Sequence, residues 1–212
     1  MICLVDSDLI KKLAVCDLLD AAFEAISAPL GEIFVLPTAR YVLLKPVKKP
    51  EQAKARLGEP VFDRLIAFFA NVQTLVAQPS AEEQRLFDDI IGIDSGEAIL
   101  FSSSAQFGEF RLATGDKNSL RALASHPECR TVCERLDGKV VCFEQIILAI
   151  IKRLGFDTAR AKIAPGANCD TALRAAFGSG LDATEDNVLA VLASYIADLR
   201  KQTGFLLVQQ LD

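Results

Sequence analysis

Short, mainly apolar segments alternate with helical patterns along most of this chain. The segments lie at residues 2–6, 33–36, 110–114 and 139–143. Continuous apolar runs of this length are typical of strands buried on both faces of a parallel sheet. Between them, apolar residues recur at helical spacing, as over residues 17–26 and 144–154. This alternation predicts an α/β fold in which a parallel central sheet is sandwiched by helices.

The chain is large enough for one full hydrophobic core, because 51% of its 212 residues are hydrophobic. We expect a first domain over residues 1–154, with a helical insertion at about 51–70. The pattern changes after this domain, where two helical segments, at about 168–177 and 185–202, replace the alternation. Residues 155–212 are therefore expected to form a mainly helical C-terminal extension that packs on the first domain.

Charge and composition restrict the classes of function. The net charge of −5 and the pI of about 5.0 argue against a protein that coats itself with nucleic acid through bulk charge. A nuclease stays compatible with these values, since acidic metal ligands lower the net charge. No apolar run is long enough to span a membrane, and Asp6 interrupts the N-terminal run too early for a signal peptide. Six cysteines without a CxxC pair predict a cytoplasmic protein with reduced thiols.

Three acidic residues are placed where a parallel sheet would bring them together. Asp6 ends the first apolar run, Asp116 ends the run at 110–114 with the sequence Thr-Gly-Asp-Lys, and Glu97 begins an apolar helix. Carboxylates that follow parallel strands point into the crevice where open α/β sheets bind ligands. Such groups suit a hard divalent cation, so we expect Asp6, Glu97 and Asp116 to bind Mg²⁺ or Mn²⁺.

The order of these pieces resembles the PIN-domain (PilT N-terminus-like) family of metal-dependent ribonucleases, which includes many bacterial toxins. The resemblance rests on an N-terminal strand ending in Asp6, a Gly-Glu-Ala helix start at Glu97, and the Thr-Gly-Asp-Lys strand end at Asp116. It covers roughly residues 1–145. The resemblance implies a parallel sheet between helices, with metal-binding carboxylates at positions 6, 97 and 116.

The resemblance also assigns secondary roles and reveals a departure. Asp8 and Asn118 stand where many members have polar or acidic residues near the metals. Many relatives carry a glutamate shortly after the second strand, but residues 37–43 (PTARYVL) contain no acid. The site therefore has one carboxylate fewer than the family pattern, and Asp94 is a candidate to compensate for it.

Each of these residues also has a purely structural explanation. Asp94 and Glu97 have the spacing of a helix capping box, and we favour capping for Asp94 but metal binding for Glu97. Asp8 has the position of a helix N-cap. A set of lysines near the acids is expected to contact the phosphate backbone of RNA, although solvation alone explains them equally well: Lys11, Lys12, Lys45, Lys48 and Lys49.

These observations lead to two main hypotheses for the function, and a metal-dependent hydrolase of another phosphoester stays open as a third option. The first is a toxin-like or RNA-processing endoribonuclease that hydrolyses phosphodiester bonds through a carboxylate-bound Mg²⁺ or Mn²⁺ ion. The alternative is a catalytically weakened PIN-like scaffold that acts as a nucleic-acid-binding or protein-interaction module. RNA is the expected partner. An inhibitor protein or a second copy of the chain stays open as a further partner, and no membrane partner is expected.

Overall fold

A computed structural model describes residues 1–211 and contains one five-stranded sheet in which all neighbouring strands are parallel. The strand order is β3-β2-β1-β4-β5. The strands are β1 (Ile2–Val5), β2 (Ile33–Val35), β3 (Gln73–Thr74), β4 (Phe110–Thr114) and β5 (Val140–Cys142). In the centre of the sheet, Leu4 of β1 is paired with Phe34 of β2 and Leu112 of β4. The predicted α/β class with a parallel sheet is confirmed.

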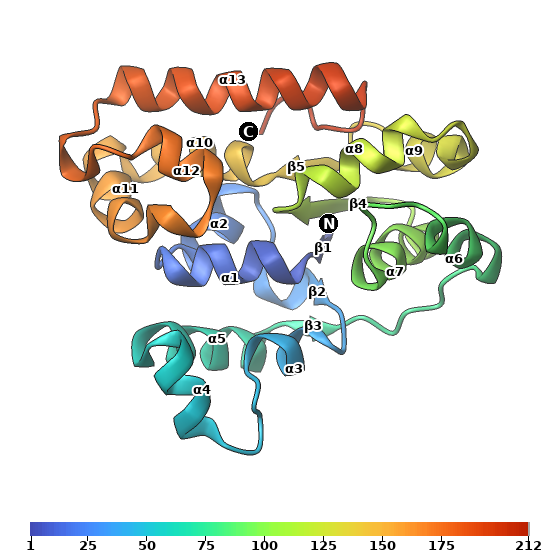
Figure 1. Cartoon of the computed structure of the whole chain (residues 1–212), viewed down its shortest axis with the longest axis horizontal. Helices are drawn as coiled ribbons and strands as arrows, with labels where there is room; N and C mark the ends of the chain where they lie inside the picture. The colour runs from blue at the N-terminus through green and yellow to red at the C-terminus, as the bar shows by residue number, and fades with distance from the viewer. Residues whose placement is uncertain (212) are drawn as a thin grey trace.

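Helices connect the strands and surround the sheet (Figure 1). Those in the first part of the chain are α1 (Ser7–Val15), α2 (Leu19–Ala25), α3 (Ala39–Leu43), α4 (Pro50–Leu57), α5 (Glu59–Asn71), α6 (Ala81–Asp88) and α7 (Ser95–Ser103). The later ones are α8 (Lys117–Ser125), α9 (Arg130–Leu136), α10 (Phe143–Leu154), α11 (Phe156–Ile163), α12 (Thr171–Ala176) and α13 (Glu185–Thr203). Short 3₁₀ helices lie at η1 (Leu30–Glu32), η2 (Ser104–Gln106), η3 (Pro127–Cys129), η4 (Ala164–Cys169) and η5 (Gly180–Asp182).

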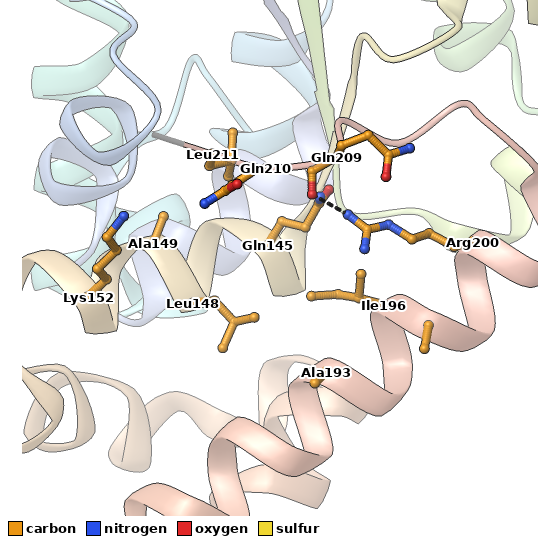
Figure 2. Close-up of a pocket in the computed structure, with 11 residues that line it drawn as sticks. Gln145, Leu148, Ala149, Lys152, Ala193, Ile196, Arg200, Gln209, Gln210 and Leu211 are labelled. Carbon is orange, nitrogen blue, oxygen red and sulfur yellow. Dashed lines mark hydrogen bonds between the residues drawn. The ribbon is translucent and has the colours of Figure 1, made fainter.

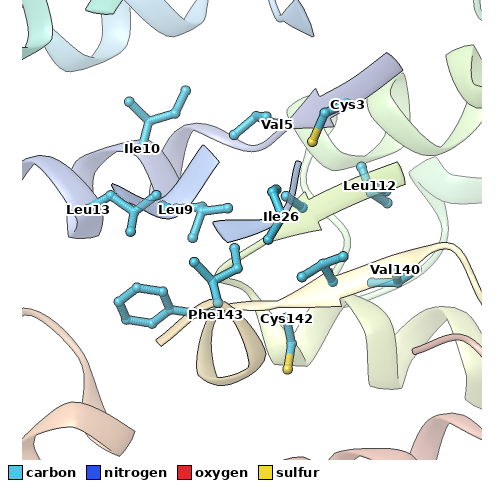
Figure 3. Close-up of a cluster of buried hydrophobic side chains, with 14 of the residues drawn as sticks. Cys3, Val5, Leu9, Ile10, Leu13, Ile26, Leu112, Val140, Cys142 and Phe143 are labelled. Carbon is cyan, nitrogen blue, oxygen red and sulfur yellow. The ribbon is translucent and has the colours of Figure 1, made fainter. Parts of the chain in front are cut away.

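The core forms one continuous cluster of buried apolar side chains that includes residues from both the sheet and the C-terminal helices. Figure 3 shows its centre, where side chains of β1, β4 and β5 meet those of α1. Cys3, Leu4 and Val5 have no exposed surface, as expected for a strand covered on both faces. Cys3 and Cys142 are part of this cluster and act as small apolar residues.

The C-terminal region packs against the part of the chain that contains the sheet. α13 contacts α8, α10 and α12, and it runs along one side of the molecule in Figure 1. Gln145 of α10 joins the two parts, because its side chain accepts from the amide of Cys142 and donates to the carbonyl of Val208. Beyond α13 the chain forms a parallel bridge between Leu207 and Val140 of β5. No helix among residues 1–211 has both the length and the apolar composition that crossing a membrane requires.

Several boundaries differ from the sequence predictions. The helical insertion expected at about 51–70 consists of α4 and α5, which are separated at Gly58, where φ is +82°. A side chain is strained at such a φ, so the glycine makes this junction favourable. Asp8 lies in the first turn of α1, and the residue at the N-cap position is Asp6. Helix α3, within the segment that has no acid after Pro37, was not predicted.

The strand order places a topological switch point between β1 and β4. The chain adds β2 and β3 on one side of β1 and then crosses to add β4 and β5 on the other side. Connections leave β1 and β4 in opposite directions, which opens a crevice at the C-terminal ends of these two strands. Asp6 directly follows β1 and Asp116 lies two residues after β4. The topology therefore brings these two acids to the location where open α/β sheets bind ligands.

Candidate functional site at the switch point

A pocket of about 350 Å³ lies at this edge of the sheet and is lined by five acidic residues. The acids are Asp6, Asp8, Asp94, Glu97 and Asp116. Three cationic side chains line the same pocket, namely those of Lys11, Lys45 and Arg56. The fold thus brings together the three principal acids expected from the sequence. It places positive charge beside them, from Lys11 of α1, from Lys45 between α3 and α4, and from Arg56 of α4.

Backbone and hydroxyl contacts join the ends of β1 and β4. The amide of Asp6 donates to the carbonyl of Ala113 over 3.0 Å, which extends the strand pairing by one residue. The hydroxyl of Thr114 donates to Asp6 Oδ2 at 3.4 Å and accepts from the amide of Asp116 at 3.0 Å. Thr114 therefore fixes the positions of both acids. The Thr-Gly-Asp-Lys sequence contains this threonine, but the local pattern does not indicate that its hydroxyl joins the two acids.

Glu97 is held by the helix start to which it belongs. Asp94 Oδ1 accepts from the amide of Glu97 at 2.8 Å, and Glu97 Oε2 accepts from the amide of Asp94 at 2.9 Å. This reciprocal pair is the capping box expected from the sequence, and it begins α7. It also fixes Glu97 at the pocket wall, where only 6% of the residue is exposed.

The remaining expected residues have other contacts. Asp116 is the N-cap of α8, and its Oδ1 accepts from the amides of Asn118 and Ser119. The side chain of Asn118 accepts from Arg121 at 3.2 Å and does not line the pocket. Lys48 and Lys49 are exposed in the segment before α4. Lys12 is buried and pairs with Asp8 and Asp170, so it lies away from solvent.

Burial and mutual repulsion disfavour the charged forms of two acids in the pocket. Burial, together with the nearby charges of Asp8 and Asp94, raises the pKa of Asp6 to about 6. Burial, followed by the charge of Asp116 and that of Asp94, raises the pKa of Glu97 to about 8. The fold thus holds carboxylates in a setting where their negative charges are incompletely balanced. A bound cation would relieve this repulsion.

The acids are not already arranged as a complete ligand set. Among residues 1–211, no group of three or more His, Cys, Asp or Glu side chains has the geometry to hold a metal ion. One oxygen of each of two acids already has a partner, since Glu97 Oε2 and Asp116 Oδ1 accept from backbone amides at the starts of their helices.

Two features of the pocket had no signal in the sequence. Arg56 of α4 donates to the carbonyl of Leu43 at 2.7 Å and to that of Lys45 at 3.2 Å. These two hydrogen bonds hold the segment between α3 and α4 next to the acids. Helix α3 also contributes Val42 and Leu43 to the pocket wall. Residues 37–43, which contain no acid, therefore present apolar side chains to the pocket.

A second pocket, also of about 350 Å³, lies between α10, α13 and residues 209–211 (Figure 2). Its lining is mainly apolar and includes no acidic residue. Arg200, one of its two cationic residues, donates to the carbonyls of Val208 and Gln209 and so holds the C-terminal segment. This pocket therefore offers no carboxylate to a hard cation, and the acidic pocket is the better candidate for chemistry.

Comparisons of the chain with protein-family models, with curated proteins and with solved structures found no match.

Proposed function

We propose that the chain is a PIN-like endoribonuclease that hydrolyses RNA phosphodiester bonds with the help of Mg²⁺ or Mn²⁺. The observation that carries the proposal is the gathering of Asp6, Glu97 and Asp116 around one pocket at the switch point of a parallel sheet. The donor set fits the ion, because carboxylates are the ligands that hard divalent cations prefer. The raised pKa values of Asp6 and Glu97 add support, since functional sites commonly hold charges in unfavourable settings.

In this proposal each residue has a distinct role. Asp6, Glu97 and Asp116 would hold the ion, which supplies a bound water of lowered pKa and stabilises charge on the departing oxygen. Asp94 positions Glu97 through the capping box. Asp8 accepts from Lys12 and supports the negative side of the pocket, while Asn118 lies at the edge of the site.

The cations are arranged to bind the phosphate backbone next to the acids. Lys11 and Lys45 are exposed and line the pocket, so they can contact phosphates on either side of the reacting bond. Lys48 and Lys49 are exposed further along the segment that Arg56 fastens, and they extend this positive strip. Lys12 is left out of the RNA contacts that we propose, because it is buried in an ion-pair network.

Cleavage of RNA by the purified protein tests the proposal. We expect cutting in the presence of Mn²⁺ and none in the presence of a chelator. Asp6→Asn keeps the size of the side chain but removes its charge, and it should slow cleavage by at least about a hundredfold. Lys152→Gln, a change in the second pocket, is the matched control and should cut at the wild-type rate. Cutting that persists unchanged in Asp6→Asn would show that the activity belongs to another site or to a contaminant.

A second function is favoured by the contacts that the acids already make. Both Asp116 and the Asp94–Glu97 pair cap helices, and Val42 and Leu43 occupy the wall where the family pattern has an acid. These contacts suit a scaffold that keeps the PIN-like architecture and binds nucleic acid or a protein without cutting. Such a scaffold would bind RNA through Lys11 and Lys45 but would not respond to Mn²⁺.

A further inference from the structure

Two cysteines from distant parts of the chain face each other at the junction between α1 and the C-terminal region. Cys16 follows α1, Cys169 ends η4, and their Sγ atoms are 4.0 Å apart although the residues are separated by 153 positions. Gly166 permits this approach. A Cβ atom at Gly166 would lie 3.0 Å from Val15 Cγ1 and 3.2 Å from Cys16 Sγ. A disulfide needs the sulfur atoms at about 2 Å, and side-chain rotation can close the remaining gap.

We propose that Cys16 and Cys169 form a thiol pair that hydroperoxides oxidise to a disulfide, which fastens the C-terminal region to α1. The pair is distinct from the other cysteines of the chain. Cys3, Cys129 and Cys142 are buried in the apolar core, and the half-buried Cys133 faces the carbonyl of Leu123 at 3.7 Å.

The two thiols differ in exposure and in pKa, so each has a different role in the oxidation. Cys169 is half-buried and can be reached by a small oxidant, whereas Cys16 has no exposed surface. The hydrogen bond between the two sulfur atoms, helped by the charge of Lys12, lowers the pKa of Cys169 against the effects of burial and Asp170. The same bond and burial raise the pKa of Cys16. Cys169 is therefore the thiol that reacts first, because the thiolate is the nucleophile.

The oxidation proceeds in two balanced steps. The Cys169 thiolate attacks one oxygen of hydrogen peroxide, the O–O bond breaks, and the departing hydroxide takes a proton to become water. Cys169 is then a sulfenic acid. The sulfur of Cys16 next attacks the Cys169 sulfur, the S–O bond breaks, and hydroxide leaves with the proton of Cys16 as a second water. In total, two thiols lose two electrons and one peroxide is reduced to two waters.

The disulfide would reinforce contacts that already join the two regions. Asp170 follows Cys169 and binds Lys12 at 2.9 Å, and Lys12 donates to the carbonyl of Gly115, next to Asp116. The bond would close a long loop and restrict the unfolded chain, so the oxidised protein should melt at a higher temperature. Through Asp170 and Lys12, the thiol pair is thus connected to Gly115, the residue before Asp116.

Peptide mapping after peroxide treatment tests this proposal without any assay of nuclease activity. The full-length protein is treated with hydrogen peroxide, its remaining thiols are alkylated, and its peptides are analysed without reduction. We expect a cross-linked peptide pair that contains Cys16 and Cys169, together with a rise in melting temperature that dithiothreitol reverses. Cys169→Ser should give neither result, because the half-buried thiol that starts the reaction is missing.

Cys133→Ser is the matched control, since it removes another half-buried thiol, and it should behave as the wild-type protein. The proposal would be overturned if Cys16 and Cys169 both stay open to alkylation after Cys133 has been oxidised. It would also be overturned if peroxide raises the melting temperature of Cys169→Ser as much as that of the wild-type protein.

Discussion

The metal-free Glu97→Gln variant is expected to melt roughly 5 °C higher than the wild-type protein near pH 8. The pKa of Glu97 is raised from 4.5 to about 8 in the folded protein, chiefly by burial. Below about pH 4.5 the carboxyl group is neutral in both the folded and the unfolded state, so its burial does not lower the free energy of unfolding. As the pH rises towards 8, the carboxyl group loses its proton freely only in the unfolded chain. The free energy of unfolding therefore falls by on the order of a few kcal/mol.

Glutamine removes this cost and keeps the structural contact, because its side-chain oxygen can still accept from the amide of Asp94. Thermal melting over a range of pH measures the difference between the two proteins. The gain should shrink as the pH falls and disappear near the ordinary pKa of glutamate. A variant that is less stable than wild type by the same amount at every pH would show that Glu97 serves only as a helix cap.

Glu83→Gln is the matched control, since Glu83 is an acid with a good partner. Its two oxygens each accept from Arg135 at 2.9 Å. Loss of its charge weakens a bidentate pair, so this variant should be less stable than wild type. Opposite effects of the same substitution at positions 83 and 97 would separate a structural carboxylate from one held for function.

The Lys12→Met variant is expected to lose about 3 kcal/mol of unfolding free energy near neutral pH. Lys12 is only 9% exposed, and its ammonium group contacts Asp8, Asp170 and the carbonyl of Gly115. Removal of one partner leaves Asp170 as a buried charge with incomplete compensation. We expect the lower end of the usual range, because Asp170 also accepts from the amides of Ala172 and Leu173.

The pH dependence gives this prediction a second readout. Burial alone would raise the pKa of Asp170, but the hydrogen bond and charge of Lys12 outweigh it and lower the pKa. The stabilisation is therefore present above the ordinary pKa of aspartate and is lost as the pH falls through the lowered folded value. Denaturant unfolding should show the defect of Lys12→Met shrinking in acid. Lys11→Met, an exposed neighbour, should lose less than about 0.5 kcal/mol, and an equal loss in both variants would contradict the proposed role of Lys12.

Much of the fold could be predicted from the sequence because most of its strands are short, mainly apolar runs. Residues 2–5 and 110–114 become adjacent central strands, and the acids that follow them meet at the switch point. Helix boundaries were less predictable. The helical pattern over residues 51–70 continues across Gly58, and only the positive φ of this residue separates α4 from α5. The sequence favours Asp8 as the N-cap of the first helix. However, β1 ends at Val5, so Asp6 takes the N-cap position and Asp8 lies in the first turn of α1.

The acids of the site could be predicted from the sequence, but the positions of its cations could not. Asp6, Glu97 and Asp116 each follow or begin a recognisable element, so topology alone brings them to one pocket. Lys11 and Lys12 look equivalent in the sequence, yet one faces the pocket and the other is buried between α1 and the C-terminal region. The contact of Lys12 with Asp170 and that of Cys16 with Cys169 join residues more than 150 positions apart. No local pattern in a single sequence contains such pairings.

Thermal melting in a titration with Mn²⁺ tests the central claim most directly, namely that the carboxylates at the switch point hold a divalent cation. At a free Mn²⁺ concentration about one hundred times the Kd, binding should stabilise the wild-type protein by about 3 kcal/mol. This corresponds to a rise in melting temperature of roughly 5–10 °C. The comparison uses KCl at equal ionic strength. Asp116→Asn can still cap α8 through its side-chain oxygen, so it should fold but respond only weakly. A wild-type melting temperature that does not change with Mn²⁺, or an equal rise in Asp116→Asn, would contradict the metal site and favour the scaffold.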